Sequence, residues 1–402
     1  MAILKSFKAW RPNPEFIKEV ACVPYDVVST EEALALAENK PNSFLHVIRP
    51  EIDLPDNIDI HADEVYQKGR ENLERLLASD FFTKDEENTV YIYRLSWNGK
   101  TKTGIFSCVS VEDYDNDIIL KHELTRPDKE DDRTKHIITQ QAHAEPVMMT
   151  FESTPEIFQL VNSTVATQPV YDFVAEDGVQ HTIWKSHESK AFENAFLKVP
   201  NFYIADGHHR CASASRAAKE MTDSNINHTG HEEYNFFPAV LFPISETRIL
   251  PYNRIIYSLP EDFMDNLKSR FELTENADPN PEKKGEVSLY INGSWIGLTL
   301  PESKNQDVAA QLDIARLQEH ILEPLLNITN QRTDENIYFI GGIRGTKELE
   351  RLVNSGEAEL AISMFATGIQ ELIDVSDAGQ LMPPKSTWFE PKLRSGLLTH
   401  TF

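Results

Sequence analysis

The sequence has few cysteines and no long apolar run. Its three cysteines, Cys22, Cys108 and Cys211, include no Cys-x-x-Cys pair, which argues against a disulfide framework and favours a reducing compartment. No stretch approaches the roughly 18 apolar residues of a membrane-spanning helix. The apolar run after Met1 is too short for a signal peptide. We therefore expect a cytoplasmic protein that has no membrane partner.

The sequence also has fewer basic residues than acidic ones. The chain carries 39 lysines and arginines against 64 aspartates and glutamates, which gives a formal net charge of -25. A net charge this negative repels the phosphate backbone of nucleic acids. Nucleic-acid binding depends instead on clustered lysine and arginine. We therefore expect a small-molecule substrate and no nucleic-acid partner, with the acidity serving solubility. The sequence leaves formation of a homo-oligomer open.

The glycine-rich phosphate loops of common nucleotide-binding folds are missing. Lys385-Ser386-Thr387 resembles the end of a Walker A motif, but the glycines that should precede it are absent. Gly341-Gly342 follows a predicted strand without the rest of a Gly-x-Gly-x-x-Gly pattern. These motifs therefore predict neither a P-loop nor a dinucleotide-binding fold.

What the sequence does contain is enough apolar surface for a large core. Hydrophobic residues make up 40% of the 402 residues, which is typical of a globular protein of about two or three domains. Predicted strands and helices alternate, and Asn98-Gly99 and Asn292-Gly293 are strong hairpin signals. We predict a mixed α+β fold whose mixed sheets contain hairpins. We expect three regions, the last with a basic tail: 1–120, 121–245 and 246–402.

The strongest functional signal is the turn from Ala205 to Arg210, which reads Ala-Asp-Gly-His-His-Arg. Residues 201–205 predict a strand and residues 209–221 a helix, so the turn lies at a helix N-terminus. Unpaired N–H groups and the helix dipole attract phosphate there. We expect four consecutive residues to bind phosphate: Gly207, His208, His209 and Arg210. Asp206 would hold Mg²⁺, orient a histidine or act as a catalytic base.

Two other interpretations of this turn stay open. Asp-Gly is a common turn dipeptide, and histidines at a helix start can simply cap the helix and pack. Asp206, His208 and His209 are also potential metal ligands, although adjacent histidines point apart on most backbones. Cys211, which follows directly, is expected to be a core residue rather than a nucleophile.

The segment 121–142 carries many ionisable groups and has two interpretations. It predicts either a solvated charged helix or a second wall of the phosphate site. In the second case Glu123 would be an acid or base, and Asp132 a metal ligand. The phosphate clamps would be Arg126, Lys129 and Arg133.

Two further segments are candidates for the same site. Asp26 follows Pro24-Tyr25 at a strand-to-helix junction and would be either a catalytic carboxylate or a turn former. The tail 381–402 is basic in an acidic protein, and either folds over the phosphate site with Lys385 as a clamp or forms a surface strap. If these segments meet, Asp26 and Glu123 should lie within roughly 15 Å of His209, since catalytic contacts act over a few ångströms.

Several blocks of the sequence resemble a known family. RPNPEF, CVPYDVVS, HELTRPDKEDDRTKH, ADGHHR and MPPKSTWFEPKLRSG are similar to blocks of domain-of-unknown-function family 1015. The ADGHHR block is also similar to the phosphate turn of the ParB/sulfiredoxin superfold, which includes free-serine kinases. This resemblance implies a ParB/sulfiredoxin-like phosphate-binding core that cradles nucleotide phosphates. Sulfiredoxin chemistry needs a cysteine where this turn has histidine, which argues against that activity.

The sequence leads to a functional hypothesis. We predict a nucleotide-dependent phosphotransferase that acts on a small hydroxylated metabolite, with serine as a candidate from the resemblance. Its cofactors would be a nucleoside di- or triphosphate and Mg²⁺, because phosphoryl transfer relies on charge clamps and positioning. The alternatives are a metal-dependent phosphoester hydrolase and a non-enzymatic nucleotide-binding or regulatory module.

Overall fold

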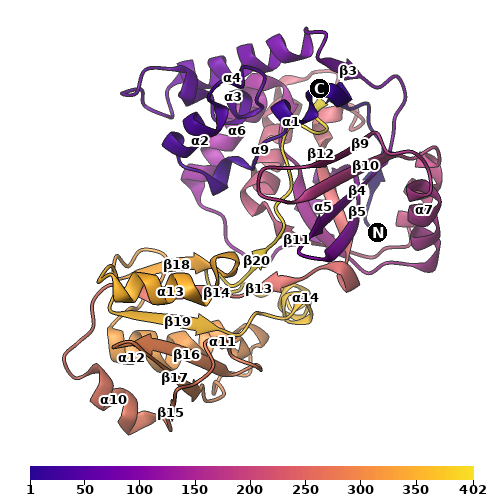
Figure 1. Ribbon diagram of the computed structural model, residues 1–402. Coiled ribbons are helices and arrows are strands. Elements are labelled where there is room, and N and C mark those ends of the chain that lie inside the picture. Colours follow the sequence, from indigo (N-terminus) through magenta and orange to yellow (C-terminus); the bar gives the residue numbers. More distant parts are fainter. The chain divides into compact units, whose positions relative to one another are not determined.

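A computed structural model describes residues 1–402, and the chain forms two compact units in it (Figure 1). The first unit comprises Met1–Thr247 and Pro391–Phe402, and the second comprises Arg248–Glu390. The sequence predicted three regions instead: 1–120, 121–245 and 246–402. The first two predicted regions form one unit because strands from both alternate in a single sheet, so neither region could bury its strands alone.

The sheet of the first unit has nine strands in the order β6-β11-β8-β12-β5-β4-β10-β9, with β1 paired to β5. Their bounds are β1 Leu4–Lys5, β4 Tyr91–Trp97, β5 Lys100–Ser110, β6 Ile119–Leu120, β8 Val147–Phe151, β9 Tyr171–Val174, β10 Gln180–Lys185, β11 Phe202–Asp206 and β12 Phe236–Pro243. β11 runs parallel to β6 and β12 runs parallel to β8, whereas the other neighbours are antiparallel. The mixed sheet confirms the predicted α+β class.

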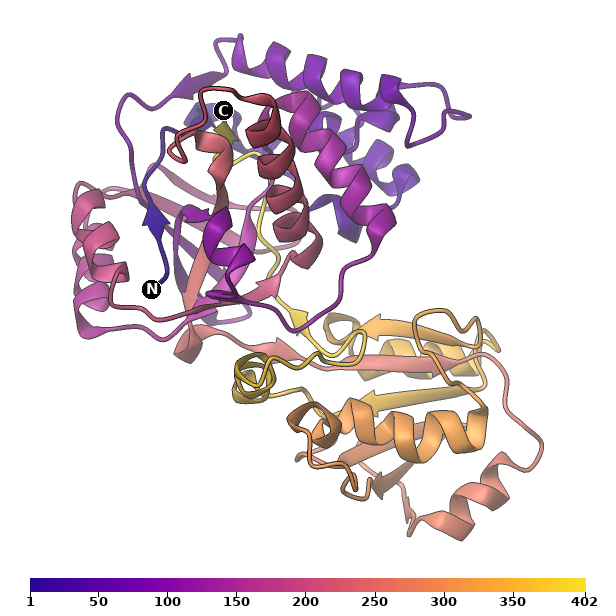
Figure 2. The same cartoon turned by 180° about the vertical axis from the view of Figure 1, so that it is seen from behind.

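Three helices of the first unit pack in sequence, and the last of them begins at the predicted turn: α4 Asp63–Leu77, α6 Pro127–Gln140 and α9 His208–Ser224. α6 packs against both α4 and α9, and Figure 2 shows α6 and α9 side by side. α9 comes close to the sheet because Cys211, Ala214 and Ala218 on its inner face are small and lie in the core. The other helices of this unit are α1 Ile17–Val20, α2 Thr30–Ala37, α3 Leu45–Ile48, α5 Val111–Asp115, α7 Pro155–Val165 and α8 Ser189–Phe196. None of the helices in the structure has the length and apolar character needed to cross a membrane.

Residues Pro391–Phe402, called here the C-terminal segment, return to the first unit after the second unit is complete. Leu393, Leu397 and Leu398 are buried there. The Thr399 N–H donates to the Trp10 carbonyl at 2.8 Å. β21 His400–Thr401 then pairs with β7 Ala142–His143, while β2 Trp10–Pro12 pairs with β3 Phe82–Lys84. The predicted basic tail is therefore, from Pro391 onward, an internal part of the first unit.

The second unit is built on a six-stranded antiparallel sheet in the order β15-β17-β16-β19-β14-β18. Its strands are β14 Tyr252–Ile256, β15 Thr274–Glu275, β16 Glu286–Ile291, β17 Ser294–Thr299, β18 Ile337–Gly341 and β19 Leu360–Met364, and β13 Ile249–Leu250 pairs separately with β20 Trp388–Phe389. Its helices are α10 Phe263–Arg270, α11 Asp313–Leu317, α12 Glu323–Leu326, α13 Gly345–Asn354 and α14 Ile369–Asp377. A Cβ at Gly341 would lie 2.8 Å from the Trp388 ring, so this glycine serves close packing.

Both predicted Asn-Gly hairpins are confirmed. Asn98-Gly99 joins β4 to β5 with φ angles of 49° and 70°, and Asn292-Gly293 joins β16 to β17 with φ angles of 51° and 78°. Positive φ at both central residues is the requirement of a type I′ turn, which asparagine and glycine meet at little cost. These two turns are thus encoded by their own residues.

Candidate functional site

The predicted strand–turn–helix junction is present, and its geometry depends on Gly207. β11 ends at Asp206, Gly207 has a φ of 106°, and α9 begins at His208. A Cβ at this position would lie only 3.0 Å from Nε of Arg210, so both the backbone angle and the packing require glycine. α9 has no side-chain N-cap, so the N–H groups of its first turn lack intrahelical acceptors and attract anions.

Arg210 lies against this turn and is only 8% exposed. Its Nη1 donates to the carbonyl oxygen of Pro146, and its Nη2 lies 3.4 Å from Oδ2 of Asp206. Burial lowers the pKa of Arg210, but the charges of Asp26 and Asp206 raise it above its ordinary value. The guanidinium is therefore permanently charged. Its buried Nε–H has no acceptor within the protein.

Asp206 is surrounded by cations. Its Oδ2 lies 3.4 Å from both Nη2 of Arg210 and Nζ of Lys392, and the side chain is 27% exposed. Burial would raise the pKa of Asp206, but Lys392 and then Arg210 hold it well below its usual range. A carboxylate that stays ionised to such low pH is a weak base, which favours a charge-balancing role among the roles predicted for Asp206.

Lys392 is a site residue that sequence reasoning missed. The prediction placed the basic clamp of the tail at Lys385, which belongs to the second unit, where its Nζ lies 5.4 Å from the centroid of the Tyr252 ring. The available signal was the second lysine of the same basic block, in Glu390-Pro391-Lys392. The role of Lys385 as a phosphate clamp stays a prediction.

The two histidines of the turn face different surroundings. The His208 ring is buried and meets the His122 ring edge to face, with centroids 4.4 Å apart. Burial and then His122 keep the pKa of His208 well below its ordinary value, so the ring is neutral. The group of His208 that can meet a phosphate is therefore its backbone N–H and not, as the sequence predicted, its side chain as well.

His209 is half-buried and links the turn to the charged segment before α6. Its Nε2 accepts the backbone N–H of Arg126 at 3.1 Å, so the ring proton of the neutral form is on Nδ1. Burial lowers the pKa of His209, while the charges of Asp26 and Glu130 oppose this effect. The His122 N–H also points at Nε2 of His208, at 3.5 Å. The structure thus brings the segment 121–142 against the turn as a second wall.

The side chains predicted as clamps in that wall have other partners. Arg126 is exposed and pairs with Asp128 at 2.7 Å, and Lys129 makes no ion pair. Arg133 is buried and donates from Nε and Nη2 to Oδ2 of Asp132, at 2.9 and 2.7 Å. Burial would raise the pKa of Asp132, but Arg133 and His136 lower it to about 2. Arg133 therefore neutralises Asp132 and does not face the turn as an unpaired cation.

The predicted metal ligands are not gathered into a metal centre. The structure contains no group of three or more His, Cys, Asp and Glu side chains that could hold a metal ion. Asp206 faces Lys392 and Arg210, and Asp132 faces Arg133. A metal role for these two carboxylates stays a prediction that would need ligands from a bound molecule.

The N-terminal block lies close enough for its charge to act on the turn. Asp26 is exposed on the short 3₁₀ helix Tyr25–Val27, and its negative charge favours the protonated forms of His209 and Arg210. Glu123 is half-buried in the loop directly after His122. Glu145, which the sequence reasoning did not select, is 6% exposed and accepts the Tyr25 N–H at 3.0 Å. Burial raises the pKa of Glu145, while Arg210 and Arg133 oppose this effect.

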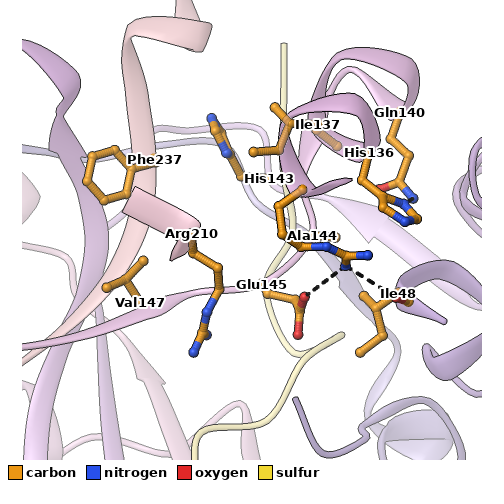
Figure 3. A pocket seen from close by; sticks show the side chains of 12 residues that line it. Ile48, His136, Ile137, Gln140, His143, Ala144, Glu145, Val147, Arg210 and Phe237 are labelled. Atoms are coloured by element: carbon orange, nitrogen blue, oxygen red, sulfur yellow. Dashed lines mark hydrogen bonds and ion pairs between the residues drawn. The ribbon is translucent and has the colours of Figure 1, made fainter. Parts of the chain in front are cut away.

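A small cavity lies beside Arg210 (Figure 3). Its volume is ≈ 40 Å³, enough for about three water molecules. Its charged lining residues are Arg133, Glu145 and Arg210. Nη1 of Arg133 lies 3.9 Å from Oε2 of Glu145 and donates to the Ile48 carbonyl at 3.4 Å. The other polar lining residues are His136, Gln140 and His143, and the remaining half of the lining is apolar. The cavity therefore has room for ordered water or for a molecule of similar size.

Neutral buried histidines should make the first unit sensitive to acid. Burial lowers the pKa of His122 from 6.5 to about 3, so the folded state binds fewer protons than the unfolded state. This contribution to stability is complete above pH 6.5 and is lost as the pH falls toward 3, at about 1.4 kcal/mol per pH unit. We expect the free energy of unfolding, measured with denaturant between pH 7.5 and 5.0, to fall less steeply with decreasing pH for His122→Gln than for the wild type. His187→Gln, at an exposed histidine, is the control and should keep the wild-type slope.

Comparison with known proteins gives a family and a set of distant structures. The family model described as protein of unknown function, DUF1015, matches residues 4–315. None of the curated proteins compared with the chain matches it. The similar solved structures include a conserved hypothetical protein from Pyrococcus furiosus, at 12% identity and a TM-score of 0.36, covering 71% of this chain and 90% of that one.

Two other similar structures carry functional names. A free serine kinase in complex with AMP is 13% identical with a TM-score of 0.37, covering 71% of this chain and 86% of that one. SbnI with a C-terminal truncation, from Staphylococcus aureus, is 11% identical with a TM-score of 0.39, covering 73% of this chain and 86% of that one. Likenesses this distant say nothing about activity.

Proposed function

The chain belongs to the DUF1015 family, and from its site we propose that it is a nucleotide-dependent phosphotransferase acting on a small hydroxylated metabolite. One observation carries the proposal. The open N-terminus of α9 lies at Gly207 beside a buried, permanently charged Arg210 whose Nε–H has no acceptor. Backbone N–H groups at a helix start and an arginine are the donors that bind phosphate in proteins.

The phosphate donor and the acceptor would bind to different groups. The N–H groups of His208 and His209 and the Nε–H of Arg210 would hold the transferred phosphate. Asp26, an exposed carboxylate whose charge acts on His209 and Arg210, would accept the proton of the acceptor hydroxyl. The hydroxyl oxygen then bonds to the terminal phosphorus as the bond to the nucleotide breaks, and the leaving nucleotide keeps the electron pair.

Mg²⁺ would arrive with the nucleotide. The ion commonly keeps several waters and binds through phosphate oxygens with one or two carboxylates, so it needs no protein cage. The absence of a three-ligand cluster is compatible with this mode of binding. Phosphate oxygens and water would then supply most of the ligands of the ion.

The acceptor would enter the cavity beside Arg210. Its volume of ≈ 40 Å³ accommodates a molecule of only a few heavy atoms. Arg133 and Glu145 form an ion pair at 3.9 Å in its wall. Serine and related small alcohols are therefore the first acceptors to test.

A ligand screen tests this function. Thermal unfolding would be measured with ATP, ADP, CTP, inorganic phosphate and pyrophosphate, each with and without Mg²⁺. A ligand at 100 times its dissociation constant should stabilise the fold by about 2.7 kcal/mol. The Asp26→Asn variant should keep the ligand-induced rise in unfolding temperature and lose the transfer of phosphate to the alcohol. A thermal shift without turnover in the wild type would indicate a binding module. Phosphate release in the absence of an acceptor would indicate a hydrolase. The absence of a thermal shift with every compound would contradict the proposal.

A further inference from the structure

A groove lies on the second unit at the edge of its sheet, where β15 pairs with β17 (Figure 1). Its volume is ≈ 490 Å³, within the range of about 300–1,000 Å³ that is typical of small-molecule sites. Gly297 on β17 leaves the sheet without a side chain here, and a Cβ at this position would lie 2.9 Å from that of Ala277 and 3.8 Å from that of Thr274. All the lining residues lie within 270–301, so the groove shares no group with the phosphate site.

A buried ion pair fixes the two sides of the groove. The side chains of Asp313 and Arg316 are each 9% exposed, and Oδ1 of Asp313 lies 3.1 Å from Nη1 of Arg316. On one side, Oδ2 of Asp313 accepts the Gly285 N–H at 2.7 Å, at the base of the loop that carries Glu282. On the other side, Nε of Arg316 donates to the Pro301 carbonyl at 2.8 Å. The fold itself therefore holds the groove open, and binding would not have to form it.

The lining of the groove combines apolar walls with an excess of carboxylates. Its apolar residues are Phe271, Ala277, Pro281, Val287, Leu298 and Pro301. Its charged residues are Arg270, Glu272, Asp278, Glu282 and Glu286. The groove thus has four carboxylates and one guanidinium, which favours a positively charged ligand.

Two of these carboxylates have no counter-charge within the protein. Glu286 lies 3.5 Å from Nζ of Lys283, and Oδ1 of Asp278 accepts a backbone N–H of its own loop at 2.8 Å. Glu272 and Glu282 are exposed and form no ion pair. These two carboxylates are therefore the groups to which a bound cation would add most.

The chemistry of the lining distinguishes between kinds of cation. A hydrated metal ion makes no use of apolar walls, and the structure gathers no cluster of three acidic or histidine side chains that could hold one. An ammonium group on an aliphatic chain uses both parts of the lining. The chain packs on the apolar walls while the charged head stays beside the carboxylates and water.

We propose that this groove is a binding site for an aliphatic polyamine. Its ammonium groups bind Glu272 and Glu282, and its methylene chain lies along Phe271 and Pro281. The inference is independent of the proposed phosphotransferase, because it rests on the second unit alone. It adds a small-molecule site to a unit in which the sequence indicated only Lys385 as a functional residue.

Calorimetry with spermidine on the full chain tests the inference. The wild type should bind spermidine, and more weakly at high salt. The double variant Glu272→Gln with Glu282→Gln should weaken binding by about threefold to tenfold, because exposed charge pairs contribute modestly. The matched control is Glu323→Gln with Glu335→Gln, at two exposed carboxylates of the same unit without ion pairs, and it should bind as the wild type does. Both double variants change the net charge equally, so a difference between them separates the groove from a general attraction to an acidic protein.

A variant that changes the shape of the groove and keeps its charge is the second test. Thr274 is exposed on β15 and lines the groove, and an aromatic residue suits a strand. Thr274→Trp should therefore keep the fold, fill part of the groove and weaken spermidine binding. In the wild type, spermidine should slow hydrogen exchange in residues 270–287 more than sodium chloride does at equal ionic strength, which covers the case in which Thr274→Trp does not fold.

Several results would overturn the inference and leave the proposed function standing. One is a wild type that binds no spermidine, and another is an equal loss of affinity in both double variants. Unchanged hydrogen exchange in residues 270–287 with spermidine bound would place the ligand elsewhere. Binding of Mg²⁺ as tight as that of spermidine, lost in the same double variant, would mean that the groove recognises charge alone.

Discussion

A chain that ends at Glu390 should fail to fold its first unit. Truncation removes Leu393, Leu397 and Leu398, which are buried in that unit. At about 1.5–3 kcal/mol for each buried leucine, the loss is about 5–9 kcal/mol, which approaches the whole stability of a typical domain. It also removes the pairing of β21 with β7. Circular dichroism and limited proteolysis should show the segment Met1–Thr247 digested while the second unit persists.

A shorter truncation is the matched control. A chain that ends at His400 loses only Thr401 and Phe402, which are half-buried, and keeps the three leucines. It should keep a cooperative unfolding transition for the first unit. If the chain that ends at Glu390 retained that transition at the wild-type temperature, the C-terminal segment would be dispensable for the fold and its buried contacts would carry little energy.

Arg210→Ala should both destabilise the first unit and abolish phosphate binding. The substitution leaves Asp206 with Lys392 alone and Glu145 with Arg133 alone. Removing one partner of a buried charged pair costs about 3–5 kcal/mol. It also removes the Nε–H donor beside Gly207. Denaturant unfolding and the thermal shift with pyrophosphate measure the two effects separately.

Arg216→Ala on the same helix distinguishes this effect from the loss of any arginine in α9. Arg216 is 40% exposed and pairs with Asp131 and Glu130 on the surface, where ion pairs contribute about 0–1 kcal/mol. The Arg216→Ala variant should have nearly the wild-type free energy of unfolding and should keep the thermal shift with pyrophosphate. A similar loss of stability in both variants would mean that Arg210 does not compensate the buried negative charges around it.

Local features of the site could be predicted from the sequence because they depend on neighbouring residues. Asp206 ends a run of strand-forming residues, Gly207 permits a φ of 106°, and the small residues after Arg210 let the helix pack closely. The same holds for the Asn98-Gly99 turn, whose two residues tolerate positive φ. The mixed α+β class followed from the alternation of such segments.

Side-chain direction was harder to predict. The sequence assigned the His208 ring to phosphate, but the first turn of α9 carries this ring inward against His122. Arg133 was predicted to be a clamp, but it pairs with the adjacent Asp132. Which side of a helix meets the core depends on what packs against it, and a spacing pattern does not give that information.

The amino-acid sequence by itself determined the junction at Gly207, the hairpin turns and the acidic character, because each depends on local backbone preference or on composition alone. Only the tertiary structure decided that Lys392 meets Asp206, that Asp26 acts on Arg210, and that the first two predicted regions form one unit. Such contacts join segments far apart in the sequence. They form because the burial of apolar surface over the whole first unit outweighs the entropic cost of closing long loops. No local sequence pattern predicts which segments this burial brings together.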